Sequence, residues 1–311
     1  MKKVLSVSIG SSTRDHRVET TIMGQDFILE RKGTDGDIKK AIELIREYDG
    51  KVDAFGMGGI DLYICGGNRR YMIKDAIPIK EAAVKTPIVD GSGLKNTLER
   101  NVIRYISENK IIDFENKRVL VVSAMDRFGM AEALEEAGAR VVCGDLIFAL
   151  GIPKRINSIR TLHRIARCIA PAVCRLPFEV LYPTGKSQEV SNERFEAFYQ
   201  EADIIAGDYL YIKKYLPRLL LGKVIITNTV TSTDVQHLAN IGVETLITTT
   251  PEYNGRSFGT NVMEAIIVAL AGKGKEELSP EEYNHYLELM GIKPRIERLN
   301  NNTATAAGGK K

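Results

Sequence analysis

Apolar residues form two patterns along the chain: short unbroken runs, and repeats at intervals of three to four residues. Both occur in residues 117–145, where an apolar run at 119–122 is followed by a short polar turn. Residues 130–137 then place apolar side chains at the spacing of one helix face, and a second apolar run at 139–143 leads to Asp145. A strand, turn, helix and strand that end on an acid are typical of the βαβ unit that opens a nucleotide-binding sheet.

Other apolar runs predict strands in both halves of the chain. In the first half they fall at residues 4–9, 26–31, 52–57 and 86–89, with a hairpin joining 62–64 to 70–73. In the second half they fall at 119–122, 139–143, 179–182, 203–206, 224–227 and 244–248. Six strands with helical connections predict a doubly wound parallel sheet in the order 3-2-1-4-5-6.

The pattern therefore predicts an α/β protein, a Rossmann-type doubly wound parallel sheet plus a smaller N-terminal α/β domain. We expect a substrate domain at residues 1–115 and a nucleotide-binding domain at 116–257. Residues 258–298 should form C-terminal helices that return to the N-terminal domain, the first of them apolar nearly all round and therefore buried. Residues 299–311 have little to bury and should form a disordered tail.

Composition narrows the function classes. The 311 residues carry a net charge of only +3, which argues against a nucleic-acid partner, and no apolar run reaches the ~18 residues of a membrane span. Four cysteines without a CxxC pair and four scattered histidines favour reduced thiols, no metal site and a cytoplasmic protein.

Ligands of doubly wound sheets bind at the carboxyl ends of the strands, and polar residues gather at the ends predicted here. Asp145 is placed to bind a ribose diol, which would favour NAD, whereas Lys154 and Arg155 could accept the extra phosphate of NADP. The glycine fingerprint of a dinucleotide site is reduced to one glycine. The predicted cofactor-binding residues are Ser123, Ala124, Asp126, Arg127, Phe128, Gly129, Asp145, Thr227, Thr249 and Thr250.

In the first domain, the segment DGSGLKN at residues 90–96 is the sharpest candidate for chemistry. Lys95 beside Asp90 would make a workable general acid–base pair, although a helix cap with an exposed lysine explains the segment equally well. Arg256 could hold a substrate carboxylate in a bidentate pair. The predicted substrate-binding residues are Asp61, Asn96, Asn228, Arg256 and Asn261.

A helix near residues 159–170 carries Arg160, Arg164 and Arg167 on one face. A solvated face is the simpler interpretation, and a contact between the two chains of a homodimer or an anionic ligand is the alternative. We expect a homodimer that acts on a small-molecule substrate.

The segments VLSVSIGSSTRDHRVE, GTDGDIKKAIELIRE, FGMGGIDLYI and DGSGLKNTLER resemble bacterial chains labelled quinate 5-dehydrogenase, and the resemblance covers most of residues 1–272. The layout of an α/β substrate domain, a Rossmann domain and a returning helix is similar to that of shikimate and quinate dehydrogenases. The motifs P-x-x-H-S-x-S, N-V-T-x-P-x-K and G-A-G-G of those enzymes do not occur in this sequence. The role of Lys95 is therefore inferred from its position.

The resemblance implies an NAD(P)-dependent oxidoreductase acting on a small hydroxylated, carboxylated, quinate- or shikimate-like substrate. The glycine-poor turn leaves a methyltransferase using S-adenosylmethionine in the same cleft as the alternative. The methyltransferase that alkylates the pyridinol of the Fe-hydrogenase cofactor is a Rossmann protein of comparable layout, a likeness at the level of the fold. A non-catalytic nucleotide sensor is the third possibility.

Overall fold

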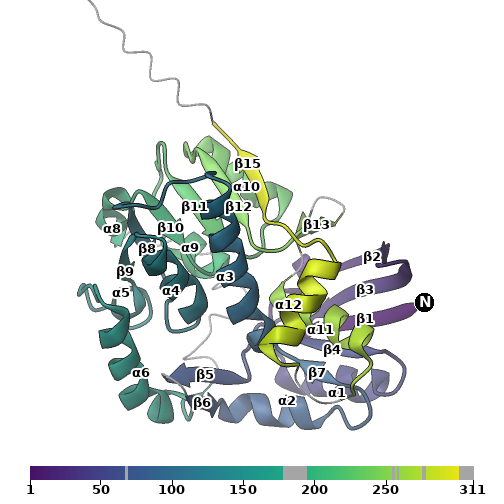
Figure 1. Ribbon diagram of the computed structural model, residues 1–311. Helices are drawn as coiled ribbons and strands as arrows, with labels where there is room; N and C mark the ends of the chain where they lie inside the picture. The colour runs from purple at the N-terminus through teal and green to yellow at the C-terminus, as the bar shows by residue number, and fades with distance from the viewer. Residues whose placement is uncertain (67–68, 178–194, 254–255, 258, 275–277, 301–311) are drawn as a thin grey trace, which may run out of the picture.

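The computed structural model describes residues 1–66, 69–177, 195–253, 256–257, 259–274 and 278–300. Two β-sheets flanked by helices organise this part of the chain, which confirms the predicted α/β class (Figure 1). The predicted strand at 179–182 lies outside the described residues.

Five described strands form the first sheet, in the order β2-β3-β1-β4-β7. Their bounds are Lys2–Ser8 (β1), His16–Ile22 (β2), Gln25–Gly33 (β3), Ala54–Gly58 (β4) and Ile88–Val89 (β7). β2 is antiparallel to β3 and the other pairs are parallel. The sequence did not predict β2, because only Val18 and Ile22 of its side chains are buried at this sheet edge. Met23 and Gly24 turn the β2–β3 hairpin with positive φ at both positions.

Short elements complete the first domain. They are η1 (Ser12–Arg14), α1 (Ile38–Tyr48), β5 (Tyr63–Gly66), β6 (Arg69–Met72), η2 (Lys74–Ala76) and α2 (Ile77–Glu81). β5 and β6 pair as the predicted antiparallel hairpin. Leu5, Phe55 and Met57 on the sheet pack with Ile45 of α1 in the core of this domain.

Six described strands form the second sheet, in the order β15-β12-β11-β10-β8-β9. Their bounds are Arg118–Val121 (β8), Arg140–Cys143 (β9), Ile204–Ala206 (β10), Val224–Thr227 (β11), Thr245–Thr248 (β12) and Arg295–Arg298 (β15). The first five are parallel, and they follow the predicted order. β15 joins β12 antiparallel and was not predicted, because Arg-Ile-Glu-Arg carries no apolar run.

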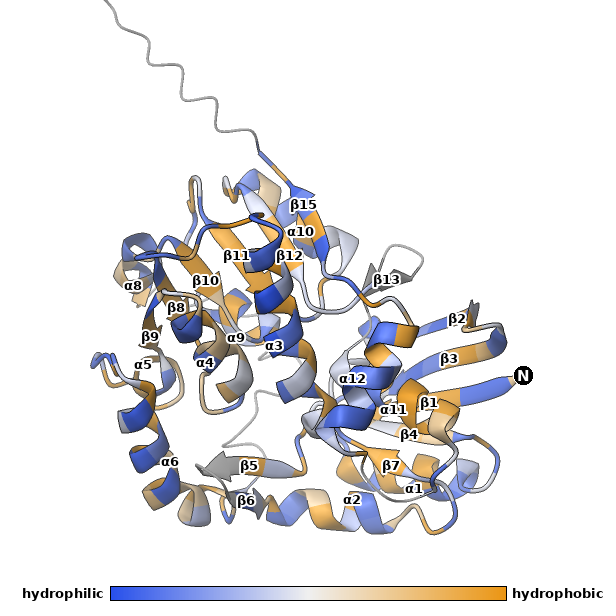
Figure 2. Cartoon of the chain, viewed as in Figure 1, coloured by the Kyte–Doolittle hydropathy of each residue, from blue (hydrophilic) through white to orange (hydrophobic). Residues whose placement is uncertain are grey.

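Helices cover both faces of the second sheet, whose strands are hydrophobic along most of their length (Figure 2). They are α4 (Phe128–Glu136), α5 (Asp145–Phe148), α6 (Ile159–Val173), α8 (Glu196–Glu201), α9 (Tyr209–Lys214) and α10 (Ser232–Asn240). α6 contains Pro171 and runs to Val173, three residues beyond the helix predicted near residues 159–170. The short pair β13 (Glu252–Tyr253) and β14 (Arg256–Ser257) follows β12.

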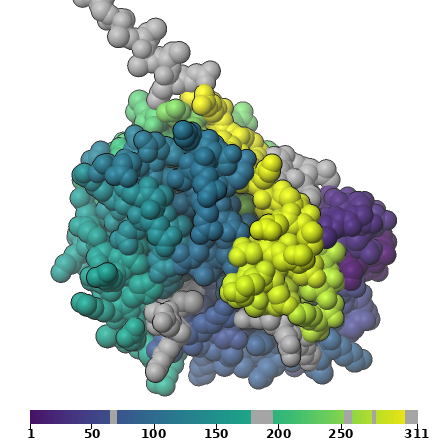
Figure 3. Space-filling view, in the orientation of Figure 1, coloured from purple at the N-terminus to yellow at the C-terminus, as the bar shows by residue number. Residues whose placement is uncertain are grey.

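Three helices join the two domains: α3 (Ser92–Glu108), α11 (Thr260–Ala271) and α12 (Pro280–Leu289). α11 packs on β1, β4 and α3, and its side chains from Val262 to Ala269 are buried, as its apolar sequence predicts. α12 packs on α3 and covers the seam between the domains (Figure 3). Beyond β15, Leu299 and Asn300 hydrogen-bond to the turn around Glu244, so these two residues belong to the sheet edge. The rest of the predicted tail lies outside the described residues.

A second connection lies at the end of α6. There the backbone amide of Lys74 donates to the carbonyl of Cys174 (3.0 Å), and the thiol of Cys174 contacts the carbonyl oxygen of Tyr71 (3.3 Å). Cys174 is buried in the core of the first domain although α6 belongs to the second. The domains are thus held together on both sides of the seam.

None of the described helices combines the length and apolar character that a membrane span requires.

Candidate functional site at the domain junction

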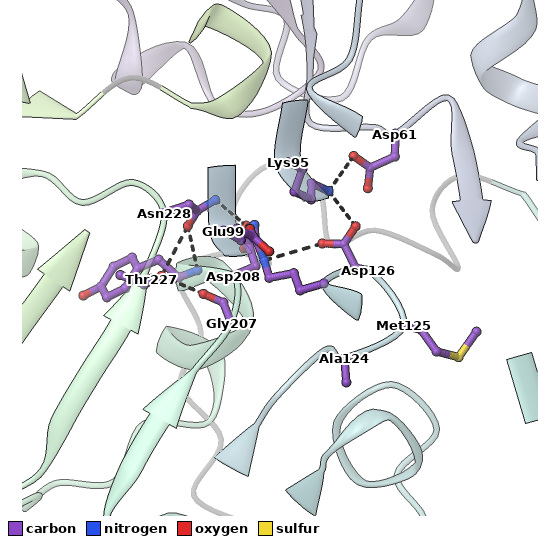
Figure 4. Close-up of polar contacts among 12 residues, drawn as sticks. Asp61, Lys95, Glu99, Ala124, Met125, Asp126, Gly207, Asp208, Thr227 and Asn228 are labelled. Carbon is purple, nitrogen blue, oxygen red and sulfur yellow. Dashed lines mark hydrogen bonds and ion pairs between the residues drawn. The ribbon is translucent and has the colours of Figure 1, made fainter. Parts of the chain in front are cut away.

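A cluster of charged side chains lies where the carboxyl ends of the second sheet meet the first domain (Figure 4). The loop after β8 contributes Asp126 and Arg127, the end of β10 contributes Asp208, and the end of β11 contributes Asn228. α3 adds Lys95 and Glu99, and the loop after β4 adds Asp61. The cluster therefore combines residues from both domains.

Lys95 is the centre of this cluster. Its ammonium lies 2.7 Å from Oδ1 of Asp126 and 3.4 Å from Oδ1 of Asp61, and its side chain is 11% exposed (Figure 4). Burial alone would lower the pKa of Lys95, but the carboxylates of Asp126 and Asp61 outweigh it and raise the pKa well above its usual value. Burial likewise opposes ionisation of Asp126, yet Lys95 and Arg127 hold the pKa of that carboxyl below its usual range. At neutral pH Lys95 is an ammonium held between two carboxylates.

Arg127 forms a second, deeper centre. Its guanidinium is 2% exposed, forms an ion pair with Glu99, which is 1% exposed, and lies 3.1 Å from Asp208. Burial disfavours both charges, and it raises the pKa of Glu99, whereas Glu99 and the neighbouring aspartates raise the pKa of Arg127. Because Nε of Arg127 is also 3.7 Å from Asp126, the two centres form one network.

The network continues along the strand ends. Asn228 donates from Nδ2 to Asp208 (2.8 Å) and accepts from the amide of Tyr209 (3.1 Å). The hydroxyl of Thr227 donates to the carbonyl of Gly207 (2.8 Å), and that of Thr250 donates to the carbonyl of Asn228 (3.0 Å). These bonds fix the ends of β10, β11 and β12 against one another.

Asp145 faces the turn that follows β8. Its carboxylate accepts from the backbone amides of Met125 (2.8 Å) and Ala124 (3.2 Å), and it is 8% exposed. Burial raises the pKa of Asp145 to about 6, although these two amides pull it down. The carboxylate therefore occupies donors that the turn of a dinucleotide site would offer to a pyrophosphate.

Asp90 makes its contacts away from the Lys95 ammonium. Its carboxylate accepts from the amide of Leu62 (2.5 Å) and from the amide (2.9 Å) and hydroxyl (2.7 Å) of Ser92. The structure thus pairs Lys95 with Asp61 and Asp126 and uses Asp90 to order the start of α3.

Other predicted residues pack helices together. Gly129 lets α4 approach α3 closely, because a Cβ there would lie 2.7 Å from the backbone oxygen of Asn96. The side chain of Asn96 accepts from Arg100 (3.3 Å) on the exposed side of α3. Phe128 stacks on His163 of α6, with 4.4 Å between ring centroids.

The remaining predicted residues lie at strand ends or at the start of α11. Among the described residues, the buried hydroxyls of Ser123 and Thr249 have no hydrogen-bond partner. Asn261 donates to Ser6 of β1 (2.9 Å). The side chain of Arg256 lies outside the described part of the structure.

Sequence reasoning assigned no role to Glu99 or Asp208. Glu99 lies one helical turn after Lys95, on the face that also buries Val102 and Ile106, so this spacing could have revealed it. Asp208 lies two residues beyond a predicted strand, and a position just past a strand end is the signal that identified Asp126. Within the described residues, no His, Cys, Asp or Glu cluster is arranged to hold a metal ion.

A surface hollow of about 460 Å³ lies elsewhere, at the β2–β3 edge of the first sheet. Arg31 and Asp15 on its wall bond to each other (2.8 Å) and Lys32 bonds to Tyr48 (2.7 Å). These groups are more exposed than the ion pair of Arg127 with Glu99, which is almost fully buried, so the junction cluster is the stronger candidate.

Fold and site together define a two-domain α/β protein with a charged junction at the carboxyl edge of its second sheet. The chain belongs to the family described as Domain of unknown function (DUF8754), whose model matches residues 93–299. A second model, Domain of unknown function (DUF8753), matches residues 3–90. No curated protein matches the chain. Neither family description names an activity, so the resemblance to quinate dehydrogenase stays a prediction.

Solved structures show only distant likeness. The chain is similar to a 5-methylthioribose transporter solute binding protein from Thermotoga lettingae, with 11% identity, a TM-score of 0.40, and 96% of this chain and 85% of that chain covered. It is similar to an ABC transporter solute binding protein from Agrobacterium vitis bound with alpha-D-tagatopyranose, with 9% identity, a TM-score of 0.40, and 98% of this chain and 97% of that chain covered. It is also similar to NAD-dependent malic enzyme from Thermotoga maritima, with 11% identity, a TM-score of 0.33, and 93% of this chain and 84% of that chain covered. These scores are too low to support a functional argument.

Proposed function

We propose that the chain is an enzyme that binds a nucleoside cofactor at the carboxyl edge of the second sheet and acts on a small hydroxylated, carboxylated substrate beside Lys95. The observation that carries this proposal is the buried Lys95 ammonium, paired with Asp61 and Asp126 at the edge where doubly wound sheets bind ligands. Buried ion pairs contribute little net stability, whereas strongly perturbed charges cluster at functional sites.

The charges of the site favour S-adenosylmethionine over a dinucleotide. A pyrophosphate binds to free backbone amides at a turn of this kind, and Asp145 already occupies two of them. Even without Glu99, whose pKa is raised by burial, the cluster holds more carboxyl groups than cations: Asp61, Asp126 and Asp208 against Lys95 and Arg127. Excess negative charge attracts a sulfonium and repels phosphates. Methyl transfer therefore becomes the first candidate and hydride transfer the second.

In methyl transfer, the bound sulfonium cofactor would supply the methyl group. Lys95 would hold the acceptor oxygen and stabilise its negative charge as the hydroxyl proton leaves. Asp126 is bonded to Lys95 and its side chain is 34% exposed, which places it to take that proton. Because the pKa of Asp126 is lowered, it is a weak base, and we expect an acceptor whose hydroxyl is itself acidic.

An NAD(P)-dependent oxidoreductase is the second candidate, and the protonation of Lys95 favours it. A nicotinamide would supply the hydride, and Lys95 would give its proton to the carbonyl oxygen of the substrate, leaving a neutral amine beside Asp126 and Asp61. This alternative requires the Asp145 carboxylate to leave the turn, or the pyrophosphate to bind elsewhere.

Thermal shift and calorimetry of the purified chain with NAD⁺, NADP⁺, S-adenosylmethionine and S-adenosylhomocysteine test both candidates. A ligand at about 100 times its Kd stabilises the folded state by roughly 2.7 kcal/mol. We expect a shift with the two adenosyl compounds and none with the dinucleotides. A shift with dinucleotides alone would replace methyl transfer by the oxidoreductase, and no shift with any of the four would refute the nucleoside cofactor.

Lys95→Met then separates an enzyme from a sensor, with Lys39→Met on the exposed side of α1 as the control. Transfer of a labelled methyl group to a panel of hydroxycarboxylates should disappear in Lys95→Met, while cofactor binding persists. Cofactor binding without turnover in the unmodified chain, unchanged by Lys95→Met, would favour the sensor.

A further inference from the structure

α11 begins at the domain junction with an uncapped N-terminus. Gly259 is its N-cap and offers no side chain to the first amides, and the first turn contains no acidic residue. The amide of Thr260 has no partner among the described residues, whereas the backbone of Gly91 lies against the amide of Asn261. The start of a twelve-residue helix carries partial positive charge and attracts anions.

Thr229, just beyond β11, faces this N-terminus. Its Oγ1 lies 3.9 Å from the position that a Cβ on Gly259 would occupy. The residue is 9% exposed, and its hydroxyl has no hydrogen-bond partner in the described part of the chain. A buried hydroxyl without a partner destabilises a protein unless a ligand or water satisfies it. Within the described residues, the hydroxyl of Thr229 and the first amide of α11 are thus both available to donate to one ligand at this place.

We propose that this place binds the carboxylate of a ligand, with the hydroxyl of Thr229 and the amide of Thr260 donating to its oxygens. Oδ1 of Asn261 lies beside it, 2.6 Å from where a Cβ on Gly259 would be, and its Nδ2 is held by Ser6. That oxygen accepts hydrogen bonds. The ligand therefore carries a hydroxyl or amino group next to its carboxylate.

Two molecules share this chemistry, and both belong to the function proposed above, on which this inference rests. One is the amino-acid end of S-adenosylmethionine, and the other is a hydroxycarboxylate substrate. Both would place an anion at the positive helix end and the rest of the molecule toward the acidic cluster around Lys95.

The first test is stability without ligand. Thr229→Val removes the unpaired hydroxyl and keeps the shape, so we expect a Tm higher by about 2 °C. Thr250→Val is the control, because Thr250 is also buried but its hydroxyl donates to the carbonyl of Asn228. It should lower the Tm. A Tm that falls in Thr229→Val as much as in Thr250→Val would show a structural hydroxyl and overturn the proposal.

The second test is calorimetry with four probes: S-adenosylhomocysteine, 5′-methylthioadenosine, quinate and methyl quinate. Thr229→Val should weaken binding of S-adenosylhomocysteine or of quinate at least tenfold, and Thr229→Ser should restore it. 5′-Methylthioadenosine and methyl quinate lack the carboxylate, so their affinity should not change. The probe whose binding depends on Thr229 shows whether the bound carboxylate belongs to the cofactor or to the substrate.

The outcomes separate this site from the proposed function. Quinate binding that depends on Thr229, with no binding of either adenosyl probe, would refute the cofactor and leave the carboxylate site standing. Tight S-adenosylhomocysteine binding that is equal in Thr229→Val, together with quinate binding that is equally unchanged, would leave the cofactor and refute the site. Failure of both carboxylates to bind would also overturn the site.

Discussion

Replacing Arg127 by Met should destabilise the protein far more than an ordinary arginine substitution. Arg127 is 2% exposed and its partner Glu99 is 1% exposed, so removal of the guanidinium leaves a buried carboxylate without its main cation. At an effective dielectric constant of 20, two charges 4 Å apart interact by about 4 kcal/mol. Breaking one partner out of a buried pair costs about 3–5 kcal/mol in measured cases. We expect a loss of that size.

The stability lost in Arg127→Met should depend on pH, and the pKa of Glu99 fixes the sign of that dependence. Burial already raises the pKa of Glu99, and loss of Arg127 raises it further, so folding then favours the protonated acid. A carboxyl whose pKa is raised by folding loses stability as pH rises through the interval from its unfolded to its folded pKa. Relative to the unmodified chain, Arg127→Met should therefore recover stability as pH falls from 8 to 5.

Urea unfolding followed by far-UV circular dichroism measures these differences, since the chain contains no tryptophan. Glu99→Gln removes the stranded charge, so the double variant Arg127→Met/Glu99→Gln should be less destabilised than the sum of the two single variants. Arg118→Met is the matched control: its ion pair with Asp203 is exposed and worth about 0–1 kcal/mol. A loss in Arg127→Met no larger than in Arg118→Met, or strict additivity in the double variant, would refute the reasoning.

Three further predictions use other parts of the molecule. Folding raises the pKa of Asp145 from 3.8 to about 6, so ionisation of this carboxyl lowers the free energy of unfolding by about 3 kcal/mol between pH 4 and 6. Asp145→Asn removes the ionisation, so the stability of the variant should vary less with pH over this interval. Urea midpoints that change with pH in the same way in the variant and the parent would contradict this prediction. Gly129→Ala should cost about 1–3 kcal/mol, because its Cβ would meet the backbone oxygen of Asn96; an unchanged midpoint would mean that α3 and α4 separate easily. In the folded chain iodoacetamide should modify exposed Cys168 well before Cys174, whose pKa is raised by burial; mass spectrometry showing equal rates would argue against the packing at the end of α6.

The fold was predictable where hydrophobic pattern and burial coincide. The parallel strands of the second sheet are buried on both faces and form apolar runs in the sequence, as does α11. β2 and β15 were missed because both are edge strands with charged side chains, and pairing at a sheet edge depends on the neighbouring strand rather than on local sequence.

The candidate site was predictable as a place but not as a set of pairs. Strand ends pointed to Asp126, and position along the chain pointed to Lys95. No local pattern could show that Asp90 would order the start of α3 while Asp61 would reach Lys95, because both acids follow strands of the same sheet. Likewise, an acid at the end of a second strand suggests a ribose ligand, and only the three-dimensional structure shows Asp145 bonded to the turn.

The charges at the junction tie formation of the site to docking of the domains. Lys95 on the joining helix α3 is paired with Asp61 of the first domain and Asp126 of the second, and Arg127 is paired with Glu99 on the same helix. Each of these groups would be costly to bury without its partner, so the seam closes with all of them in register or leaves them in water. α11 on one side and the end of α6 on the other hold the seam closed with apolar contacts and backbone hydrogen bonds. The stability of those contacts compensates for charges that a purely structural interface would replace with apolar residues. These charged groups at the carboxyl edge of the sheet are therefore the feature on which the proposed function rests.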